Sequence, residues 1–441
     1  MTNLAWNIER VLPSAIADLH KLISIPSISS MPEHDGDVTA CRDTVAGLFR
    51  DLGAAEVKFL DGGGKPAVWA HFPGPEGTPT VLLYAHYDVQ PIGDAAAWTS
   101  PAFEPTERDG RLYARGSADD KGGIAVHLAA LRVFDGKPPV GVKVFIEGEE
   151  EVGSPTMPTL LDRYRDELSA DVYVVTDSVN WEVGKPSFTT SLRGVADCKV
   201  TVSTLEQGLH SGQFGGVVPD ALTALCRLLA TLHDEAGNVA IEGLHQGTAP
   251  DLDYPLDRLK EETGLLDGVS QIGDGPVVQR MWFKPACSVL AIDATPVAQA
   301  SNTLIPSARA KVSVRLAPGQ DPVAASDALE AHLLKHAPWG ARVEVSRGQM
   351  GAPSAISLGD RAEAAKAAFR EAFGVDPVEM GCGGSIPIVA EFADRNPDAM
   401  VLVTAVTDPN SRMHGIDESL DLGDLAKAAL AEALLLEKLQ A

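Results

Sequence analysis

Acidic and imidazole side chains follow four apolar runs of this sequence near the point where each run ends. The runs are VLLYA at 81–85, VKVFIEG at 142–148, DVYVVT at 171–176 and AMVLVTAV at 399–406. The side chains that follow them are His86, Asp88, Glu149, Glu150, Glu151, Asp177 and His414. Each run predicts a strand, and ligands of open α/β sheets bind at the carboxyl ends of the strands. We therefore expect these side chains to converge on one edge of a sheet, where Asp119 and Asp120 of GSADDKGG join them at a turn entering a helix.

Two imidazoles among several carboxylates indicate a metal site. Each signal alone has an ordinary explanation, because a histidine after a strand is usually structural and a run of glutamates is usually a solvated turn. Their recurrence at successive strand ends favours a site. Mixed nitrogen and oxygen ligands suit zinc, and also manganese or cobalt. So many carboxylates repel one another unless cations lie between them, and a pair of metals about 3.5–4 Å apart supports hydrolysis by a bridging water.

The elements that must position these residues form an α/β pattern. Helical spacing of apolar residues predicts helices at 7–23, 37–52, 121–134, 156–168, 361–373 and 422–439. Unbroken apolar strands that alternate with helices indicate a mainly parallel sheet covered on both faces. The middle of the chain differs, because CKVTVST at 198–204 and ARAKVSVRLA at 308–317 alternate apolar and polar residues. With helices at 219–233 and 322–336, this segment predicts an α+β insertion, which gives domains at 1–191, 192–353 and 354–441.

Composition narrows the class of protein. The 441 residues carry a formal net charge of −25, which disfavours a nucleic-acid partner because phosphate binding needs a basic face. Five cysteines with no C-x-x-C spacing argue against a disulfide framework or a cysteine zinc site. The charged N-terminus has no signal-peptide core, and no apolar run reaches the roughly 20 residues of a membrane span. We expect a cytoplasmic protein.

Other catalytic motifs do not occur in the sequence. It has no G-x-S-x-G, no H-E-x-x-H and no G-x-G-x-x-G after a strand, and proline follows each Gly-Lys pair, so there is no P-loop.

The motifs together resemble the co-catalytic metallopeptidases that include carnosinase-type dipeptidases, glutamate carboxypeptidase, aminoacylase and succinyl-diaminopimelate desuccinylase. The motifs are HYDVQP at 86–91, LYARGSADDKGG at 112–123, EGEEEVGS at 147–154, TDSVNW at 176–181, LRG at 192–194, LHSG at 209–212, GGSIP at 383–387 and RMHGIDE at 412–418. HYDVQP, Trp98 and LYARGSADDKGG are most similar to the dipeptidase branch. Gly415 departs from the Ser or Ala that this branch often has after its histidine.

The resemblance implies roles for the strand-end residues. His86 and Asp177 would bind one metal, Glu151 and His414 the other, and Asp119 would bridge both, with an Asp119–Asp120 peptide that is strained or cis. Asp88 would orient His86 through its second ring nitrogen, and Glu150 would be the general base. This alignment is anchored on Val152-Gly153-Ser154, and a one-residue slip would move these roles to Glu149 and Glu150.

The insertion resembles the family's lid and dimerisation domain. The resemblance implies a homodimer in which His210 reaches the active site of the partner subunit and stabilises the oxyanion. Thr303 and Arg315 match positions that hold the substrate carboxylate, and Gly384 and Ser385 would line the same pocket. For Arg315 the alternative is an ordinary salt bridge on a sheet.

The sequence therefore predicts a dipeptidase with two divalent metals, zinc first and manganese or cobalt as alternatives. A bridging water would attack the peptide carbonyl while Glu150 moves the proton to the leaving amine. The same ligands would serve an N-acyl amino acid deacylase or desuccinylase. A non-catalytic binding protein on this fold is the alternative from another class, and it predicts a broken ligand set or a missing base.

Overall fold

The computed structural model describes residues 3–384 and 386–440, which form two compact units. The first unit comprises Met1–Thr190, Ile356–Met380 and Ile386–Ala441. The second comprises Ser191–Ala355 with Gly381–Ser385. The insertion expected at 192–353 thus lies within the second unit, which also takes in a short segment from further along the chain.

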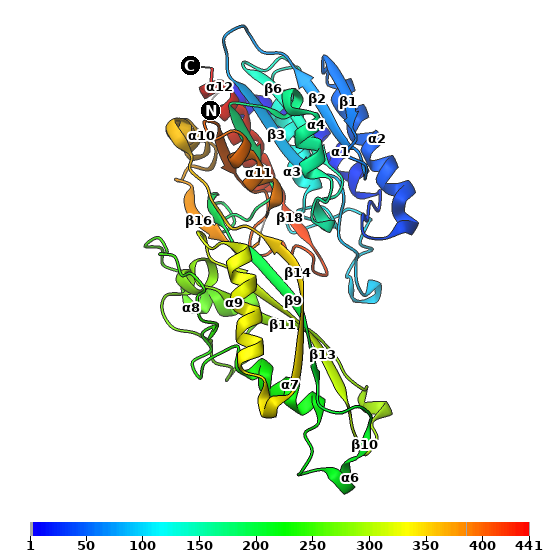
Figure 1. Cartoon of the computed structure of the whole chain (residues 1–441). Helices are drawn as coiled ribbons and strands as arrows, with labels where there is room; N and C mark the ends of the chain where they lie inside the picture. Colours follow the sequence, from blue (N-terminus) through cyan, green and yellow to red (C-terminus); the bar gives the residue numbers. More distant parts are fainter. Residues whose placement is uncertain (1–2, 385, 441) are drawn as a thin grey trace. The chain divides into compact units, whose positions relative to one another are not determined.

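Within the described residues, the first unit contains a six-stranded sheet (Figure 1). Its spatial order is β1 (Glu56–Leu60), β2 (Ala67–Phe72), β6 (Gly141–Glu147), β3 (Thr80–His86), β7 (Val172–Val175) and β17 (Met400–Val403). The strands from β6 to β17 run parallel, whereas β2 pairs antiparallel with both β6 and β1 at one side of the sheet. The mainly parallel sheet predicted from the apolar runs is confirmed.

Helices cover both faces of this sheet, as Figure 1 shows. The core on one face joins α1 (Asn3–Ile23), α2 (Asp35–Asp51), α3 (Lys121–Arg132), α10 (Ala362–Phe373) and α12 (Leu422–Lys438). The other face carries α4 (Met157–Arg163), α5 (Arg165–Leu168) and α11 (Pro387–Arg395), where Tyr173 of β7 stacks on Phe392 at a centroid distance of 4.0 Å. Because both faces are buried, β3 reads as an unbroken apolar run.

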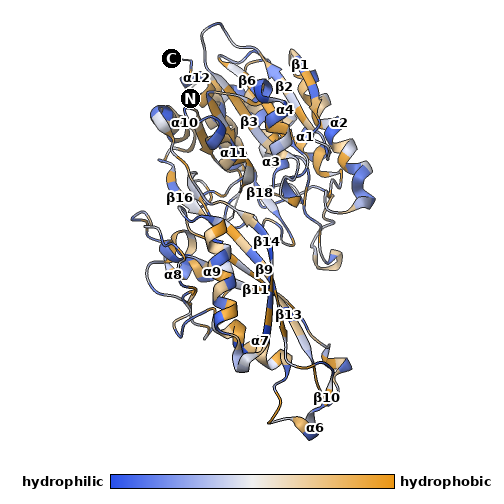
Figure 2. Cartoon of the chain, in the orientation of Figure 1, coloured by the Kyte–Doolittle hydropathy of each residue, from blue (hydrophilic) through white to orange (hydrophobic). Residues whose placement is uncertain are grey.

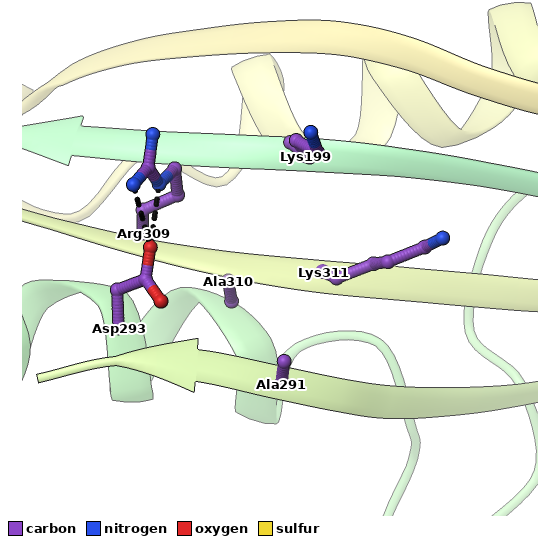
Figure 3. Close-up of a pocket in the computed structure, with 6 residues that line it drawn as sticks. All are labelled: Lys199, Ala291, Asp293, Arg309, Ala310 and Lys311. Atoms are coloured by element: carbon purple, nitrogen blue, oxygen red, sulfur yellow. Dashed lines mark hydrogen bonds and ion pairs between the residues drawn. The ribbon is translucent and has the colours of Figure 1, made fainter. Parts of the chain in front are cut away.

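The second unit is an α+β structure around a four-stranded antiparallel sheet in the described residues. The order is β11 (Ala286–Asp293), β13 (Ser307–Leu316), β9 (Gly194–Ser203) and β14 (Arg342–Gly351). The helices α7 (Ala221–Ala230) and α9 (Pro322–Lys335) share an apolar core with one face, and α9 shows both hydrophobic and hydrophilic residues in Figure 2. Figure 3 shows polar side chains of the strands, Lys199, Lys311 and Arg309, the last paired with Asp293 at 2.6 Å. The predicted burial of one face only is confirmed for β13.

Smaller elements complete the fold. They are β4 (Thr106–Arg108), β5 (Arg111–Tyr113), β8 (Ser187–Leu192), β10 (Leu209–His210), α6 (Ser211–Phe214), α8 (Leu256–Thr263), β12 (Thr303–Leu304), β15 (Ser354–Ala355), β16 (Val378–Cys382) and β18 (Ser419–Asp421). Among the helices of residues 3–384 and 386–440, none is both long and apolar enough to cross a membrane.

Several predicted elements differ from the observed ones in their bounds, and the helix predicted at 7–23 begins already at Asn3. The helix predicted at 156–168 is two helices, because Tyr164 leaves the helical conformation at φ −116° and ψ 42°. The helix predicted to begin at residue 37 begins at Asp35, directly after a short 3-10 turn. The strand predicted at 399–406 is limited to Met400–Val403, and the chain beyond it makes only isolated bridges.

Candidate metal centre

The predicted strand-end residues meet at one edge of the first unit's sheet. The strand β3 ends at His86, β6 leads into a 3-10 turn at Glu150–Val152, and β7 ends two residues before Asp177. His414 lies in the segment between β17 and β18. The ligand atoms fall into two groups, His86 with Glu150 and Asp177, and Asp119 with Glu151 and His414, and within each group they lie within 4.8 Å of one another.

Asp119 lies between the two imidazoles. Its Oδ1 is 3.0 Å from Nε2 of His86, and its Oδ2 is 2.9 Å from Nε2 of His414. The Nε2 of His414 is also 3.2 Å from Oε2 of Glu151, and the Nε2 of His86 is 4.0 Å from Oδ1 of Asp177. One carboxylate therefore faces both groups, with a different oxygen toward each.

The turn into α3 holds Asp119 in this position. The Asp119–Asp120 peptide is cis, as the resemblance implied. Asp120 caps α3 by accepting a hydrogen bond from the Gly123 backbone N–H at 3.2 Å. A Cβ at Gly123 would lie 2.4 Å from Oδ1 of Asp120, so only glycine allows this close approach.

Asp88 and Gln90 support the ligands from the segment after β3. The Nδ1 of His86 lies 3.0 Å from the carbonyl oxygen of Asp88 and 3.5 Å from its Oδ1. Because a carbonyl oxygen only accepts, Nδ1 carries a hydrogen and Nε2 faces the site. The Glu151 backbone N–H donates to Oδ2 of Asp88, and Nε2 of Gln90 donates to Oε2 of Glu151 at 2.8 Å. Gln90 was assigned no role from the sequence, although it lies within HYDVQP.

The three glutamates after β6 have different surroundings. Glu149 accepts hydrogen bonds from the Lys65 backbone N–H and the Thr156 hydroxyl, and it belongs to neither group. Glu150 lies with His86 and Asp177, whereas Glu151 lies with His414. The one-residue slip would make Glu149 the general base and Glu150 the ligand beside His414, whereas in the structure Glu151 lies with His414 and Glu149 lies in neither group.

The electrostatics of this cluster follow from the crowding of its carboxylates. Burial, followed by the neighbouring Glu150, raises the pKa of Asp177 well above its ordinary value. Burial, with the carboxylates of Glu151 and Asp119 added to it, raises the pKa of Glu150 to about 8, although His86 opposes the shift. Hydrogen bonds to Asp119 and Glu151 raise the pKa of His414 to about 10. Without cations, protons on the histidines and on some of the carboxylates therefore reduce the electrostatic repulsion in the cluster.

The same residues fit divalent cations. The imidazole nitrogens and carboxylate oxygens are the ligand types that zinc and related ions take. The Oδ1 of Asp88 is buried without a hydrogen-bond partner and lies on the Nδ1 side of His86. A carboxylate in that place supports a histidine whose other nitrogen binds a metal. Cations between the acids would replace the protons that burial otherwise retains.

The remaining predicted residues that the structure describes belong to the second unit. His210 in β10 pairs with Thr303 in β12, and both residues are exposed. Arg315 in β13 is exposed too, and Gly384 lies shortly before α11. Ser385 lies outside the described residues. The metal groups lie in the first unit, so the roles expected for these residues stay predictions.

The protein has a mainly parallel α/β sheet, and two imidazole–carboxylate groups lie on either side of one aspartate at its strand ends. This fold and site define the class of metal-dependent hydrolases. The sequence profile described as peptidase family M20/M25/M40 matches residues 82–438. The chain belongs to this family, and the metallopeptidase class expected from the motifs is confirmed.

Relatives in this family cover nearly the whole chain. The cysteinylglycine-S-conjugate dipeptidase of Corynebacterium striatum is 35% identical over 439 residues, which are 98% of this chain and 96% of that protein. The Beta-Ala-His dipeptidase of Rattus norvegicus is 27% identical over 420 residues, 86% of this chain and 83% of that one. The structure of the dipeptidase Dug1p from Saccharomyces cerevisiae superposes with a TM-score of 0.86 at 24% identity, covering 100% of this chain and 98% of that one. That likeness shows the fold.

Proposed function

We propose that this protein is a dipeptidase that uses two divalent metal ions. The observation that carries the proposal is the pair of ligand groups at this edge of the sheet, with one oxygen of Asp119 facing His86 and the other facing His414. Relatives named as dipeptidases, which match nearly the full length of the chain, support the choice of substrate class.

The ligand set leaves Glu150 available for proton transfer. If Asp119 is shared, His86 and Asp177 complete one site, and Glu151 and His414 complete the other. Each ion then has three protein ligands, and catalytic zinc sites keep an open position beyond three. Glu150 lies within ligand distance of His86 and Asp177, but their site would already have three ligands and needs no further carboxylate. Glu150 would therefore be free to accept a proton from a water held between the two sites.

The bound ions would polarise the peptide carbonyl and make a water acidic enough to attack at neutral pH. Glu150 would take the proton of this water and deliver it to the leaving amine. Asp88 would keep His86 in one tautomer and orientation. We propose zinc as the metal, with manganese or cobalt as alternatives, because imidazole and carboxylate ligands accept all three.

The second unit would supply substrate recognition and a homodimer. We propose that Thr303 and Arg315 hold the substrate carboxylate and that Gly384 and Ser385 line the same pocket. His210 would stabilise the oxyanion in the site of the partner subunit. The planar fork of an arginine suits a carboxylate. Support for self-association comes from the apolar residues exposed at 289–297, because exposed apolar patches mark interaction sites. The cytoplasmic location stays a prediction.

Metal analysis joined to a substrate panel tests the proposal. The purified protein is treated with chelator, assayed on dipeptides and N-acyl amino acids, and assayed again after addition of Zn²⁺, Mn²⁺ or Co²⁺. We expect dipeptide hydrolysis that the chelator abolishes and a metal restores. Full activity of the metal-free protein would overturn the metal mechanism, and a preference for N-acyl amino acids would identify a deacylase.

A further inference from the structure

A buried ion pair lies behind the group formed by Asp119, Glu151 and His414. The guanidinium of Arg115 donates from Nη1 to Oε2 of Glu418 at 2.5 Å, and the two residues are 1% and 0% exposed. They lie in LYARGSADDKGG and RMHGIDE, two of the motifs that also carry metal-ligand candidates. A charged pair this far from water needs further hydrogen bonds around it to be stable.

Those hydrogen bonds go to the segments that carry metal ligands. The Oε1 of Glu418 accepts from the backbone N–H groups of Ala118 and Asp119, at 3.0 and 3.1 Å. The Nη2 of Arg115 donates to the carbonyl oxygens of Gly415 and Pro91, at 3.1 and 3.3 Å. Gly415 directly follows His414, and Pro91 ends the motif that begins at His86. One ion pair thus joins three separate segments of the chain.

The segment that carries His414 needs such support. Arg412, His414 and Asp417 all have positive φ angles, of 52°, 61° and 58°. Side chains other than glycine adopt this conformation at an energetic cost, and it persists only where surrounding contacts hold it. The Thr99 hydroxyl and backbone N–H bind the carboxylate of Asp417 from one side, and Arg115 with Glu418 hold the loop from the buried side.

We infer that Arg115 and Glu418 are positioning residues that hold Asp119 and His414 in place for the second metal ion. The inference rests on the proposed two-metal function. The pair belongs to neither ligand group, and it would act through the backbone N–H of Asp119 and the backbone carbonyl of Gly415, next to His414.

Glu418→Gln breaks this arrangement without changing its volume. The carboxylate uses one oxygen for two backbone N–H groups and the other for Arg115. An amide has only one oxygen, so in either orientation its NH₂ group faces a donor. Arg115→Lys is the conservative partner variant, because lysine keeps a cation beside Glu418 but lacks the planar fork that also reaches Gly415 and Pro91.

Asp18→Asn is the matched control. Asp18 is buried and pairs with Arg132, which joins α1 to α3, and the pair has no hydrogen bond to a ligand segment. Both variants lose the contact of a buried carboxylate with an arginine, which in the control is partly exposed. A general loss of stability should therefore appear in both. Only the Glu418 variant should affect metal binding.

The experiment titrates chelator-treated protein with ZnCl₂ by calorimetry and measures metal retained after gel filtration. Wild-type protein and Asp18→Asn should bind two ions per chain. In Glu418→Gln we expect the weaker of the two affinities to fall about 10- to 100-fold, which is usual for a residue that orients a metal ligand, with a smaller fall in Arg115→Lys. In Glu418→Gln the zinc-induced rise in melting temperature should shrink, whereas Asp18→Asn should keep it.

Several results would overturn the inference. Wild-type affinity for both ions in Glu418→Gln would do so while leaving the two-metal function intact. An equal loss of affinity in Asp18→Asn would show that stability alone is responsible. If Glu418→Gln does not fold, as judged by circular dichroism, wild-type affinity in Arg115→Lys decides against the inference. A wild-type chain that binds no metal would instead overturn the proposed function itself.

Discussion

Three consecutive glutamates of identical chemistry have different surroundings in this protein. Glu149 is 6% exposed and its carboxylate is occupied by Lys65 and Thr156, whereas Glu150 and Glu151 face the two imidazoles. Sequence spacing alone could not distinguish them, because a 3-10 turn that begins at Glu150 directs successive side chains differently. The difference provides a matched pair of variants.

Glu150→Gln should lower kcat roughly 100- to 10,000-fold, which is the usual contribution of a general base. The amide keeps the shape of the side chain but cannot accept the proton of the attacking water. Metal content should stay at the wild-type level, as measured by atomic emission alongside steady-state kinetics. Glu149→Gln serves as the control, and its kcat should stay within a few-fold of wild type. A larger loss in the Glu149 variant would mean that the assignment is shifted by one residue.

The pKa of Glu150 predicts how pH affects the stability of the metal-free protein. Burial and the neighbouring acids raise this pKa from 4.5 to about 8. Between these values the folded chain keeps a proton that the unfolded chain has released, so the free energy of unfolding should fall as pH rises. One proton contributes at most about 1.4 kcal/mol per pH unit. Urea unfolding in chelator across this range should show a shallower slope for Glu150→Gln, and an unchanged slope would contradict the raised pKa.

At the scale of elements, strands that are buried on both faces are easier to predict from the sequence than strands that are half exposed. The strands β3, β6 and β7 stand out as apolar runs because helices cover both of their faces. The antiparallel β1 and β2 were not predicted, since EVKFL mixes polar and apolar residues and AVWAHF is short. The break at Tyr164 has no proline or glycine to signal it.

The loop between β1 and β2 bears on the site through Gly64. A Cβ at Gly64 would lie 2.2 Å from Oε1 of Glu149, so Gly64→Ala should displace Glu149 and the turn that follows it. We expect a loss of about 1–3 kcal/mol in the free energy of unfolding, as in other overpacked sites, together with weaker metal binding. Denaturant unfolding and zinc titration measure the two effects.

Gly47→Ala is the control for this prediction. Gly47 lies within α2, and a Cβ there would meet nothing within 4 Å. Alanine should therefore stabilise the protein by about 0.5–1 kcal/mol through helix propensity. If Gly64→Ala lowered neither the free energy of unfolding nor the affinity for zinc, the close approach of this loop to Glu149 would not be needed to hold the 3-10 turn that begins at Glu150.

At the scale of the whole molecule, the sequence indicated which side chains gather in the two candidate ligand groups, but it did not indicate the residues proposed for recognition. His86, Glu151, Asp177 and His414 come after strands of the parallel sheet, and the ends of such strands meet by topology. His210 and Arg315 lie instead in a unit whose strands are half exposed, where an arginine in β13 has the same pattern as any surface residue. Only the resemblance gave these residues a role, and no spacing rule leads to it.

The proposed homodimer makes a prediction about the second unit. Val289, Leu290, Ile292 and Val297 are 41%, 58%, 44% and 94% exposed in or just after β11, which lies at an edge of its sheet. If a second copy covers them, Leu290→Lys should raise the dimer dissociation constant about 10- to 100-fold, because burial of a leucine contributes about 1.5–3 kcal/mol.

Sedimentation equilibrium measures this constant, and Leu266→Lys is the control. Leu266 belongs to the same unit and is 75% exposed, but it lies in the segment after α8, away in sequence from both β11 and His210. The control should dimerise like wild type. If His210 acts in the site of the partner subunit, the monomeric Leu290 variant should also lose turnover while it keeps its bound metals, because its ligands all lie in the first unit. A fully active monomer would show that the active site needs no partner and would remove the proposed role of His210.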